Sequence, residues 1–254
     1  MRYCRVEGRT LPESFHKAMT KLSAMGEVVP CPDYDTEMIE CCMDIVVNNP
    51  MREPMITRLG IFDFESLQQY LMEISDGILD FMVGADENTW EYTYHQRIGN
   101  QIDFVINELK RNPNSRRAVI NVRDNEVDQA TTHPACLQSI QFLIRKGALD
   151  MIVLMRSNDA YNATFMNMFA FIVGIQYKIA CELGVPVGTY VHRANSFHVY
   201  EKDYEHFKAM IKQIHSKPFS ELTYKYKHWQ PLMVAEIPKI MQKVNDQKKK
   251  YNIK

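Results

Sequence analysis

Residues 132–138 read Thr132-His133-Pro134-Ala135-Cys136-Leu137-Gln138, and a second polar cluster, Arg156-Ser157-Asn158-Asp159, follows further along the chain. The interval between them is strand-like, rich in apolar and β-branched residues. Cys136 follows a Pro-Ala turn and opens a predicted strand, and the ends of such elements are where side chains reach a cleft. A lone cysteine is more often a buried structural residue. Here, a thiol placed ahead of an Arg/Ser/Asn/Asp cluster indicates a nucleophile that faces an anion-binding pocket, with arginines that lower its pKa.

The pattern of apolar residues around this region predicts helices and strands in mixed order. The predicted helices cover residues 11–25, 64–75, 102–110 and 165–183. The predicted strands cover residues 37–47, 118–122, 136–144, 151–155 and 187–200, with a short turn at 146–148 that joins two of them as a hairpin. The helix over 165–183 is apolar almost all round, so we expect it to be central and buried. The charged tail, 247–250, is expected to fray. Because the order lacks βαβ regularity, we predict one α+β domain over residues 1–254.

Composition narrows the class of protein. The chain has 254 residues, of which 46% are hydrophobic and 24% charged, and its formal net charge is −1. Without a basic excess, nothing indicates nucleic acid as an obligatory partner. No apolar run approaches the roughly 18–20 residues that span a bilayer, and the N-terminus lacks the apolar segment of a signal peptide. The six cysteines show no zinc-type spacing. We therefore expect a cytoplasmic protein with reduced thiols and no metal.

Arginines near the predicted strands indicate a phosphate site. Arg156, with Ser157 beside it, ends an otherwise apolar strand, where its planar guanidinium needs a partner such as a phosphate. Arg116 and Arg117 enter another strand and project to opposite faces. Alone, these two arginines would be interpreted as solvated surface charges. Together with Arg156 and Ser157 they predict an anion site.

Polar residues also lie within apolar surroundings. Asn167 is on the apolar helix, where a buried amide without hydrogen bonds would cost about 1–3 kcal/mol. It either caps a neighbouring backbone group or presents a donor and an acceptor that match the O4/N3–H edge of uracil. His198 and Tyr200 alternate along a strand and share one face. They bind sugar hydroxyls or belong to a half-exposed sheet face.

These pieces together resemble one family, the thymidylate synthase superfamily, which includes pyrimidine nucleotide hydroxymethylases. The resemblance covers roughly residues 90–205, more weakly before. The segments that carry it are Tyr94, Asn112–Arg117, Ala135-Cys136 with Gln141-Phe142, Arg156-Ser157-Asn158-Asp159, Asn167 and His198-Val199-Tyr200.

The resemblance implies a fold with a central mixed β-sheet packed by helices, and a homodimer formed through a face of that sheet. It also implies roles for individual residues. Cys136 would add to C6 of a pyrimidine nucleotide, so that C5 attacks the methylene group of 5,10-methylenetetrahydrofolate or a related reduced pterin. Tyr94 would take part in the proton-transfer network. Asp159 would contribute to the side of the site that holds the base and the folate. Arg52, Arg116, Arg117, Gln141, Arg156, Ser157, Asn158, Asn167, His198 and Tyr200 would bind the substrate.

Within that set, Arg116 and Arg117 would reach the phosphate held by the neighbouring subunit. The family's catalytic glutamate is expected in the helix near residues 65–73, where Glu65 and Glu73 both qualify.

Departures from the family pattern bear on the reaction. Leu137 replaces the usual histidine after the cysteine, and Asn158 replaces a cysteine in the arginine cluster. The chain ends Tyr251-Asn252-Ile253-Lys254 instead of in the family's apolar C-terminus, so we expect a site that admits water. The leading hypothesis is folate-dependent C5 hydroxymethylation of a pyrimidine nucleoside 5′-monophosphate (dUMP, dCMP or CMP). The alternatives are thymidylate synthesis from dUMP and a catalytically silent nucleotide-binding homologue.

Overall fold

A seven-stranded sheet with the order β1-β3-β8-β7-β6-β5, in which β2 pairs with β3, forms the centre of the computed structural model, which describes residues 1–85 and 90–253. The pairs β1/β3 and β7/β8 are parallel and the other neighbours antiparallel, which confirms the predicted mixed sheet. Its strands are β1 (Tyr3–Gly8), β2 (Glu27–Cys31), β3 (Thr36–Val47), β5 (Val119–Asn121), β6 (Leu137–Arg145), β7 (Ala148–Asp159) and β8 (Val187–Tyr200). A separate two-stranded sheet joins β4 (Ile56–Thr57) to β9 (Thr223–Tyr224).

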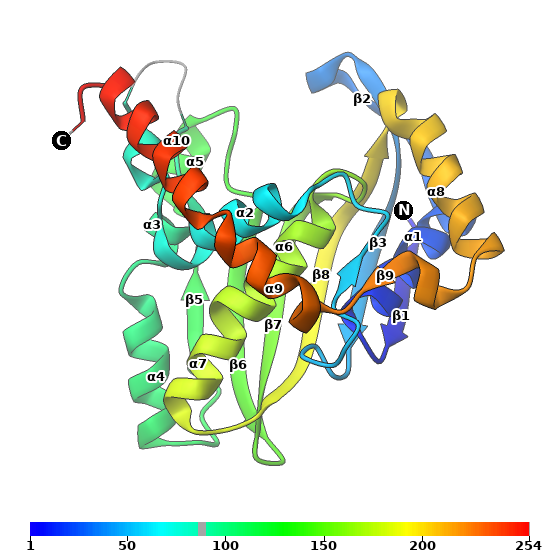
Figure 1. Cartoon of the computed structure of the whole chain (residues 1–254). Coiled ribbons are helices and arrows are strands. Elements are labelled where there is room, and N and C mark those ends of the chain that lie inside the picture. Colours follow the sequence, from blue (N-terminus) through cyan, green and yellow to red (C-terminus); the bar gives the residue numbers. More distant parts are fainter. Residues whose placement is uncertain (86–89, 254) are drawn as a thin grey trace.

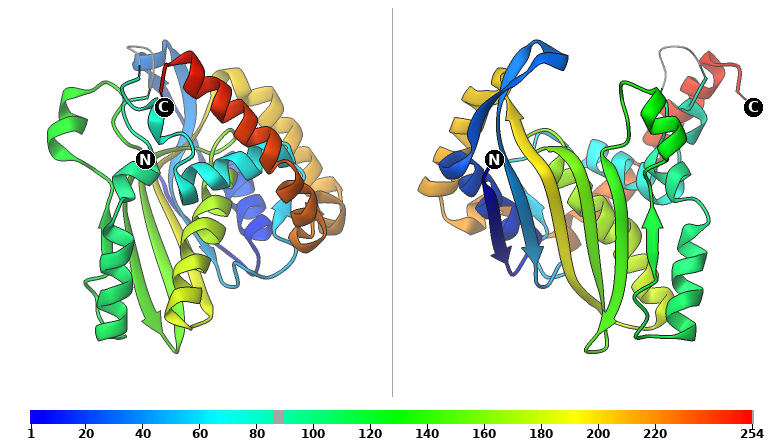
Figure 2. Two further views of the ribbon diagram at one scale, coloured as in Figure 1. Left: turned by 60° about the vertical axis from the view of Figure 1, so that its left-hand side comes forward. Right: turned by 180° about the vertical axis from the view of Figure 1, so that it is seen from behind.

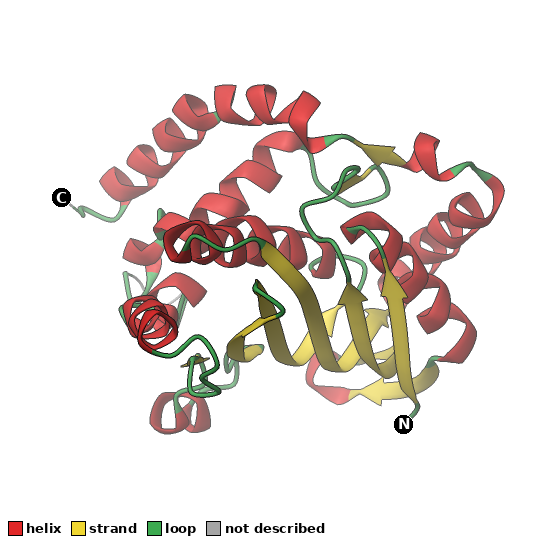
Figure 3. Cartoon of the chain, turned by 90° about the horizontal axis from the view of Figure 1, so that it is seen from below, coloured by secondary structure: helices red, strands yellow, loops and turns green. Residues whose placement is uncertain are grey.

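Helices pack on one face and at both edges of the sheet (Figure 1). They are α1 (Leu11–Met25), α2 (Phe64–Asp76), α3 (Tyr94–Ile98), α4 (Gln101–Arg111), α5 (Asn125–Ala130), α6 (Thr164–Phe171), α7 (Tyr177–Leu183), α8 (Tyr204–Ser216), α9 (Tyr226–Ala235) and α10 (Ile237–Lys250). Seen from behind and from below, the opposite face of the sheet carries no helix of the described residues (Figures 2 and 3). The fold is therefore α+β, with one covered and one open sheet face.

Helices α6 and α7 fill the core and form one continuous helix, because a π-helical turn over Ile172–Gln176 joins them. By length and composition Thr164–Leu183 could span a membrane, but 72% of its apolar window is buried inside the protein. The predicted central, buried helix is confirmed. The π turn was not expected from the sequence, because all of its residues fit a regular helical pattern.

Several element boundaries follow directly from local sequence signals. Helix α1 ends before Gly26 as predicted, and its N-cap Thr10 accepts a hydrogen bond from the Glu13 backbone. The β6–β7 hairpin turns at Lys146 and Gly147, which both have positive φ, typical of a tight hairpin turn. The prediction that the charged tail frays was wrong, since residues 247–250 form the end of α10.

The site is positioned by two pairs of packed elements. Strands β7 and β8 are parallel, with Ser157 opposite Ser196 and Asp159 opposite His198, so their polar carboxyl ends lie at the same edge of the sheet. Above them, α2 packs closely on the π turn. Gly174 leaves little room for a side chain there, since a Cβ at this position would lie 3.1 Å from Cδ1 of Leu71 on α2. This contact brings the inner face of α2 down onto the end of α6.

Candidate active site

A cleft of about 920 Å³ opens at the carboxyl ends of β7 and β8. The predicted site residues that line it are Tyr94, Cys136, Arg156, Ser157, Asn158, Asp159, Asn167, His198 and Tyr200. They come from α3, β7, α6, β8 and the segment before β6. The structure therefore brings together most of the residues that the sequence singled out.

Arg156 holds the segment that carries Cys136. Its Nε donates to the carbonyl oxygen of Ala135 at 3.1 Å, and its Nη2 to that of Pro134 at 2.7 Å. The backbone also joins the two strands, since Arg156 N donates to the Cys136 carbonyl at 2.8 Å. Burial raises the pKa of the Cys136 thiol, while the Arg156 charge opposes that shift. The expected lowering of this pKa was wrong because desolvation outweighs the arginine.

Three tyrosines surround the thiol. Tyr70 and Tyr94 line the cleft, and Tyr92 lies in an adjoining hollow. The Tyr94 hydroxyl accepts a hydrogen bond from the Leu137 backbone at 3.3 Å, and the Tyr92 and Tyr94 rings lie 5.7 Å apart. Burial raises the pKa of all three phenols, so they are neutral near pH 7. They can donate hydrogen bonds but are not ready bases.

Tyr70, and not a glutamate, is the α2 residue that faces the cleft. Its hydroxyl donates to Oδ1 of Asn167 on α6. The carboxylate of Glu65 instead accepts hydrogen bonds from Lys239 and Lys243 on α10, away from the cleft. Glu73 lines the adjoining hollow and is held by Gln69 at 2.9 Å, and burial raises its pKa. Of the two glutamates, only Glu73 therefore lies beside the site.

Asn158 ends a buried chain of hydrogen bonds. Its Oδ1 lies 2.8 Å from both His192 Nε2 and the Thr164 hydroxyl, and His192 Nδ1 lies 2.8 Å from the Tyr190 hydroxyl. Since Asn158 Oδ1 only accepts, His192 carries its proton on Nε2 and Tyr190 donates to Nδ1. Burial lowers the pKa of His192 to about 3, so the ring is neutral. The Asn158 amide nitrogen donates to no described residue and remains available to the cleft that Asn158 lines.

His198 presents a free acceptor. Its Nδ1 donates to the Ser196 carbonyl at 3.1 Å, which leaves the lone pair on Nε2. Among the described residues this buried nitrogen has no hydrogen-bond partner. Burial is the main cause that lowers the pKa of His198. The Tyr200 ring packs edge-on against His198 at 4.7 Å, and burial raises the pKa of Tyr200 to about 12.

Asp159 is largely occupied by the following turn. Its Oδ1 accepts from the backbone of Tyr161 at 3.0 Å and of Asn162 at 2.8 Å, while Oδ2 accepts from the Asn162 side chain at 2.9 Å. It lines the cleft, but these bonds make it first a cap for the turn before α6.

Four predicted residues do not line the cleft of their own chain: Arg52, Arg116, Arg117 and Gln141. Arg52 is exposed in the loop before β4. Arg116 and Arg117 are exposed before β5. Gln141 lies within β6, opposite Val119, and its Nε2 donates to the Arg116 carbonyl at 3.0 Å. Within its own chain this amide stabilises the approach to β5, and the role of Gln141 in substrate binding stays a prediction.

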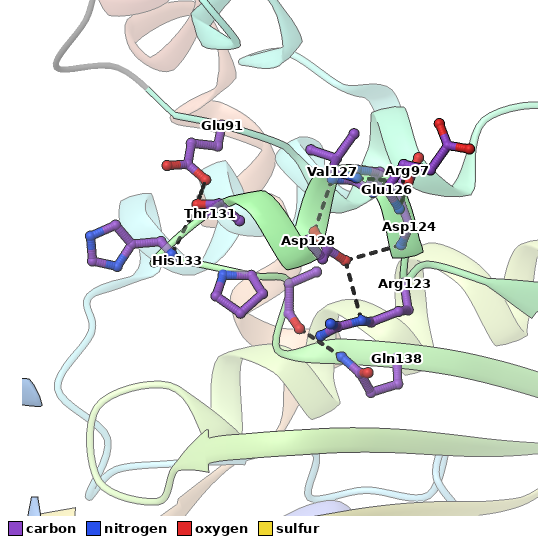
Figure 4. A network of polar contacts seen from close by, with 12 residues as sticks. Glu91, Arg97, Arg123, Asp124, Glu126, Val127, Asp128, Thr131, His133 and Gln138 are labelled. Atoms are coloured by element: carbon purple, nitrogen blue, oxygen red, sulfur yellow. Dashed lines mark hydrogen bonds and ion pairs between the residues drawn. The ribbon is translucent and has the colours of Figure 1, made fainter.

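A polar network supports the segment between α5 and Cys136 (Figure 4). The side chain of Asp128 is fully buried and accepts from Arg97 Nη2 at 3.1 Å and from the Asp124 backbone at 3.0 Å. Arg123 Nε lies 3.9 Å from Oδ2 of Asp128. Further along, Thr131 donates to Glu91 and accepts from the His133 backbone. These contacts hold α5 and the residues that precede Cys136.

Comparison with known proteins identifies this arrangement. The family model described as thymidylate synthase matches residues 58–252. The chain belongs to the thymidylate synthase family. It is 30% identical over 215 residues to a protein of Methanocaldococcus jannaschii described as "Putative thymidylate synthase", covering 78% of this chain and 92% of that protein. It is 27% identical over 219 residues to a protein of the same description from Methanosarcina barkeri, covering 82% and 95%.

A solved structure agrees at the level of the fold. Thermostable thymidylate synthase A from Bacillus subtilis superposes with a TM-score of 0.65 at 18% identity, covering 80% of this chain and 84% of that one. Membership of the thymidylate synthase family makes the protein a one-carbon transferase, in a family that uses methylenetetrahydrofolate and binds a nucleotide substrate. The predicted family, fold class and enzyme class are confirmed.

The cleft of this thymidylate synthase family member also contains residues that sequence reasoning missed. Tyr70 was not predicted as a site residue, because an aromatic residue in an amphipathic helix is usually interpreted as part of the core. A second group, Cys31, Asp33, Tyr34 and Met38, comes from the β2–β3 hairpin, which lies before the residues that the family model matches. Tyr34 packs edge-on against Tyr200 at 5.6 Å. The hairpin thus forms a wall beside His198 and Tyr200.

Proposed function

We propose that the protein transfers a one-carbon unit from methylenetetrahydrofolate to C5 of a pyrimidine nucleoside 5′-monophosphate and that the product carries a hydroxymethyl group. The observation that carries the proposal is the common cleft of Cys136, Asn167 and Arg156, which come from the segment before β6, from α6 and from β7. A nucleophile, a base-reading amide and an anion-binding guanidinium are the three groups that this chemistry needs at one site. We further propose that residues 1–254 form one domain and act in the cytoplasm.

In the proposed reaction the Cys136 sulfur bonds to C6 of the pyrimidine, and the electron pair of the C5–C6 double bond moves toward C5. The thiol must first lose its proton, which burial disfavours and the Arg156 charge favours. C5 would then bond to the one-carbon unit, and loss of the C5 proton with release of the folate nitrogen would leave an exocyclic methylene group on C5. Addition of water to that carbon would move the electron pair of the exocyclic double bond into the C5–C6 bond and expel the Cys136 sulfur. The neutral phenols of Tyr92 and Tyr94 beside the thiol can donate hydrogen bonds to charge that develops on the ring.

The rest of the nucleotide has matching groups. Arg156 uses Nε and Nη2 on backbone carbonyls, so its Nη1 and the Ser157 hydroxyl remain for the phosphate. The unpartnered Nε2 of His198 is an acceptor for a sugar hydroxyl, and Tyr200 lies beside it. Asp159 and Asn158 complete the wall toward α6.

A reduced folate would supply the one-carbon unit at the oxidation level of formaldehyde. A hollow of about 610 Å³ adjoins the cleft and shares Tyr70, Tyr94 and His133 with it. Its other lining includes Trp90, Tyr92 and Glu73. Aromatic faces with a few polar groups suit a flat, hydrogen-bonding pterin ring, so the residues present fit this cofactor.

The hydroxymethyl product is favoured by a polar, water-accessible wall. Thr132, His133 and Asp33 line the cleft and are exposed, and the Asn158 amide stands where the family pattern has a cysteine. Water that reaches the one-carbon intermediate would be captured as a hydroxymethyl group, whereas hydride transfer would give a methyl group. The second candidate, thymidylate synthesis from dUMP, is favoured by the descriptions of the relatives. A catalytically silent nucleotide-binding homologue is the third.

We also propose a homodimer formed through the open sheet face. Ile152 is exposed there, and Val191 and Thr189 are half-buried on the neighbouring strand. Arg193 and Asp44 pair on the same surface at 3.3 Å. A twofold interface would bury this patch against its copy. Arg116 and Arg117, exposed and away from their own cleft, would then contact the phosphate bound by the partner.

The test is incubation with methylenetetrahydrofolate and, separately, dUMP, dCMP, UMP and CMP, followed by mass spectrometry. Addition of one carbon with oxygen supports hydroxymethylation, while a methyl product together with dihydrofolate shows thymidylate synthesis. Neither product from any nucleotide, with no exchange of the C5 hydrogen, leaves the silent homologue. The matched control is Cys136→Ala, which must abolish both product and exchange.

A further inference from the structure

Two residues of the cleft are joined across the α2–α6 interface. Tyr70 projects from α2 and donates its hydroxyl proton to Oδ1 of Asn167 on α6, and both residues line the cleft beside Cys136. The helices pack tightly just beyond this point, at Leu71 and Gly174, so the hydroxyl is fixed relative to the amide. Neither Tyr70 nor this hydrogen bond belongs to the segments that carry the family resemblance.

This hydrogen bond fixes the orientation of the Asn167 amide, with its oxygen toward Tyr70. If the amide were reversed, its NH₂ group would meet the phenol, and the buried hydroxyl proton would lose its only acceptor among the described residues. In the observed orientation Oδ1 faces Tyr70, and no hydrogen bond from Nδ2 to another described residue is found, so Nδ2 and the second lone pair of Oδ1 remain for a ligand in the cleft that Asn167 lines.

These two free positions match one base better than the other. Uracil offers an acceptor at O4 and a donor at N3, which pair with the Asn167 NH₂ group and with its Oδ1. Cytosine offers a donor at N4 and an acceptor at N3, so the amide would have to reverse and give up the Tyr70 bond. The cost of that reversal falls only on cytosine.

We propose that Tyr70 is a specificity-determining positioning residue, which orients the Asn167 amide so that the site prefers uracil nucleotides over cytosine nucleotides. The inference rests on the proposed function, because it assumes that Asn167 meets the base. Tyr70 acts through Asn167 and transfers no proton itself. The raised pKa of its phenol agrees with this role, since a neutral phenol stays a donor throughout the physiological range.

The experiment measures nucleotide binding without folate, so that it does not depend on turnover. Dissociation constants for UMP, CMP, dUMP and dCMP are determined by calorimetry for the wild type, Tyr70→Phe and the matched control Tyr226→Phe. The control removes a phenol oxygen from a ring that packs on Phe169 of α6 at 5.4 Å but does not line the cleft. A net hydrogen bond of ordinary strength corresponds to a change of about fivefold to tenfold in the uracil/cytosine ratio. Tyr70→Phe should lose that preference, and Tyr226→Phe should keep it.

A double-mutant cycle separates positioning from a general effect on the fold. In an Asn167→Ala background no amide remains to be oriented, so adding Tyr70→Phe should leave the base ratio unchanged. An unchanged ratio in Tyr70→Phe alone, or a wild type that prefers cytosine, would overturn the role of Tyr70 while the proposed function survives. A wild type that binds none of the four nucleotides would instead overturn the proposed function, and the inference with it.

Discussion

The Arg156 guanidinium donates to the carbonyl oxygen of Pro134 at 2.7 Å. A second bond, from Nε to Ala135, makes Arg156 a clamp on the two residues before Cys136. One side chain therefore orders the backbone before Cys136 and places a positive charge near the Cys136 sulfur. The same side chain has Nη1 left for an anion, so in the proposed function this one residue would couple substrate binding to thiol activation.

Arg156→Lys should weaken both roles, because a lysine keeps the charge but not the planar fork. We expect a loss of about 2 kcal/mol in the free energy of unfolding, from the charge-assisted bonds to Pro134 and Ala135. The nucleotide KM should rise about tenfold. Alkylation of Cys136 by iodoacetamide should slow at fixed pH if the lysine charge lies farther from the sulfur.

The matched control for this prediction is Arg145→Lys, at the opposite end of β6, where the arginine also bonds a carbonyl. It should change neither KM nor the alkylation rate. Equal effects of the two variants on KM would contradict the assignment of Arg156 to the phosphate.

Asp128→Asn should loosen the segment that leads to Cys136. The side chain of Asp128 is fully buried and that of Arg97 is 13% exposed, so the change removes the buried charge that pairs with a largely buried guanidinium and leaves it only the more exposed Asp124, 3.7 Å from Nη1. Breaking such a pair costs about 3 kcal/mol. Chemical denaturation should show that loss, and Cys136 should be alkylated faster because the segment after α5 is released. Asp103→Asn, on the exposed side of α4, should be neutral, and a similarly neutral Asp128→Asn would exclude the network as a support.

The sequence predicted those parts of the site that local pattern controls. Strand ends and glycine turns marked β7, β8 and the β6–β7 hairpin, and the register of β7 on β8 then placed Arg156–Asp159 beside His198. Residues in one polar run at a strand end remain together whatever the rest of the chain does. For this reason the residues predicted at the ends of β7 and β8 line one cleft.

What the sequence could not predict depends on contacts between distant elements. Tyr70 and Asn167 are 97 residues apart, and only the packing of α2 on α6 joins them. Gln141 lies on β6, where the family resemblance placed a substrate-binding residue, but its side-chain amide donates a hydrogen bond to the Arg116 carbonyl. The pKa of Cys136 depends on how deeply β6 begins inside the protein, which composition does not reveal. The charged end of α10 is helical, and Lys249 pairs with Asp246 one turn earlier at 3.3 Å.

Acid should destabilise the protein through its buried histidines. Burial lowers the pKa of His192 from 6.5 to about 3 and that of His16 to about 4. Below about pH 6.5 the unfolded chain binds these protons and the folded chain does not, so the free energy of unfolding falls as pH decreases. Each histidine contributes about 1.4 kcal/mol per pH unit until its folded pKa is reached.

His192→Gln should therefore flatten this dependence between pH 6 and 4, although it removes the Tyr190 contact and lowers stability at pH 7. Urea denaturation at a series of pH values measures both effects. His215→Gln, exposed in the last turn of α8, should leave the slope unchanged. A slope that survives His192→Gln intact would show that this ring does not remain neutral in the folded chain.

The proposed dimer predicts complementation between inactive variants. Cys136→Ala lacks the nucleophile, and the double variant Arg116→Ala/Arg117→Ala lacks the arginines that are expected to reach the partner's phosphate. In a mixture that exchanges subunits, half of the dimers are mixed, and one of the two clefts in each has both Cys136 and the partner's arginines. About a quarter of wild-type activity should return. If the arginines acted within their own chain, no cleft in any dimer would be complete and activity would stay near zero. Light scattering measures the oligomer, and mixing Cys136→Ala with Arg156→Ala is the control, which should also regain no activity, because both residues line the same cleft.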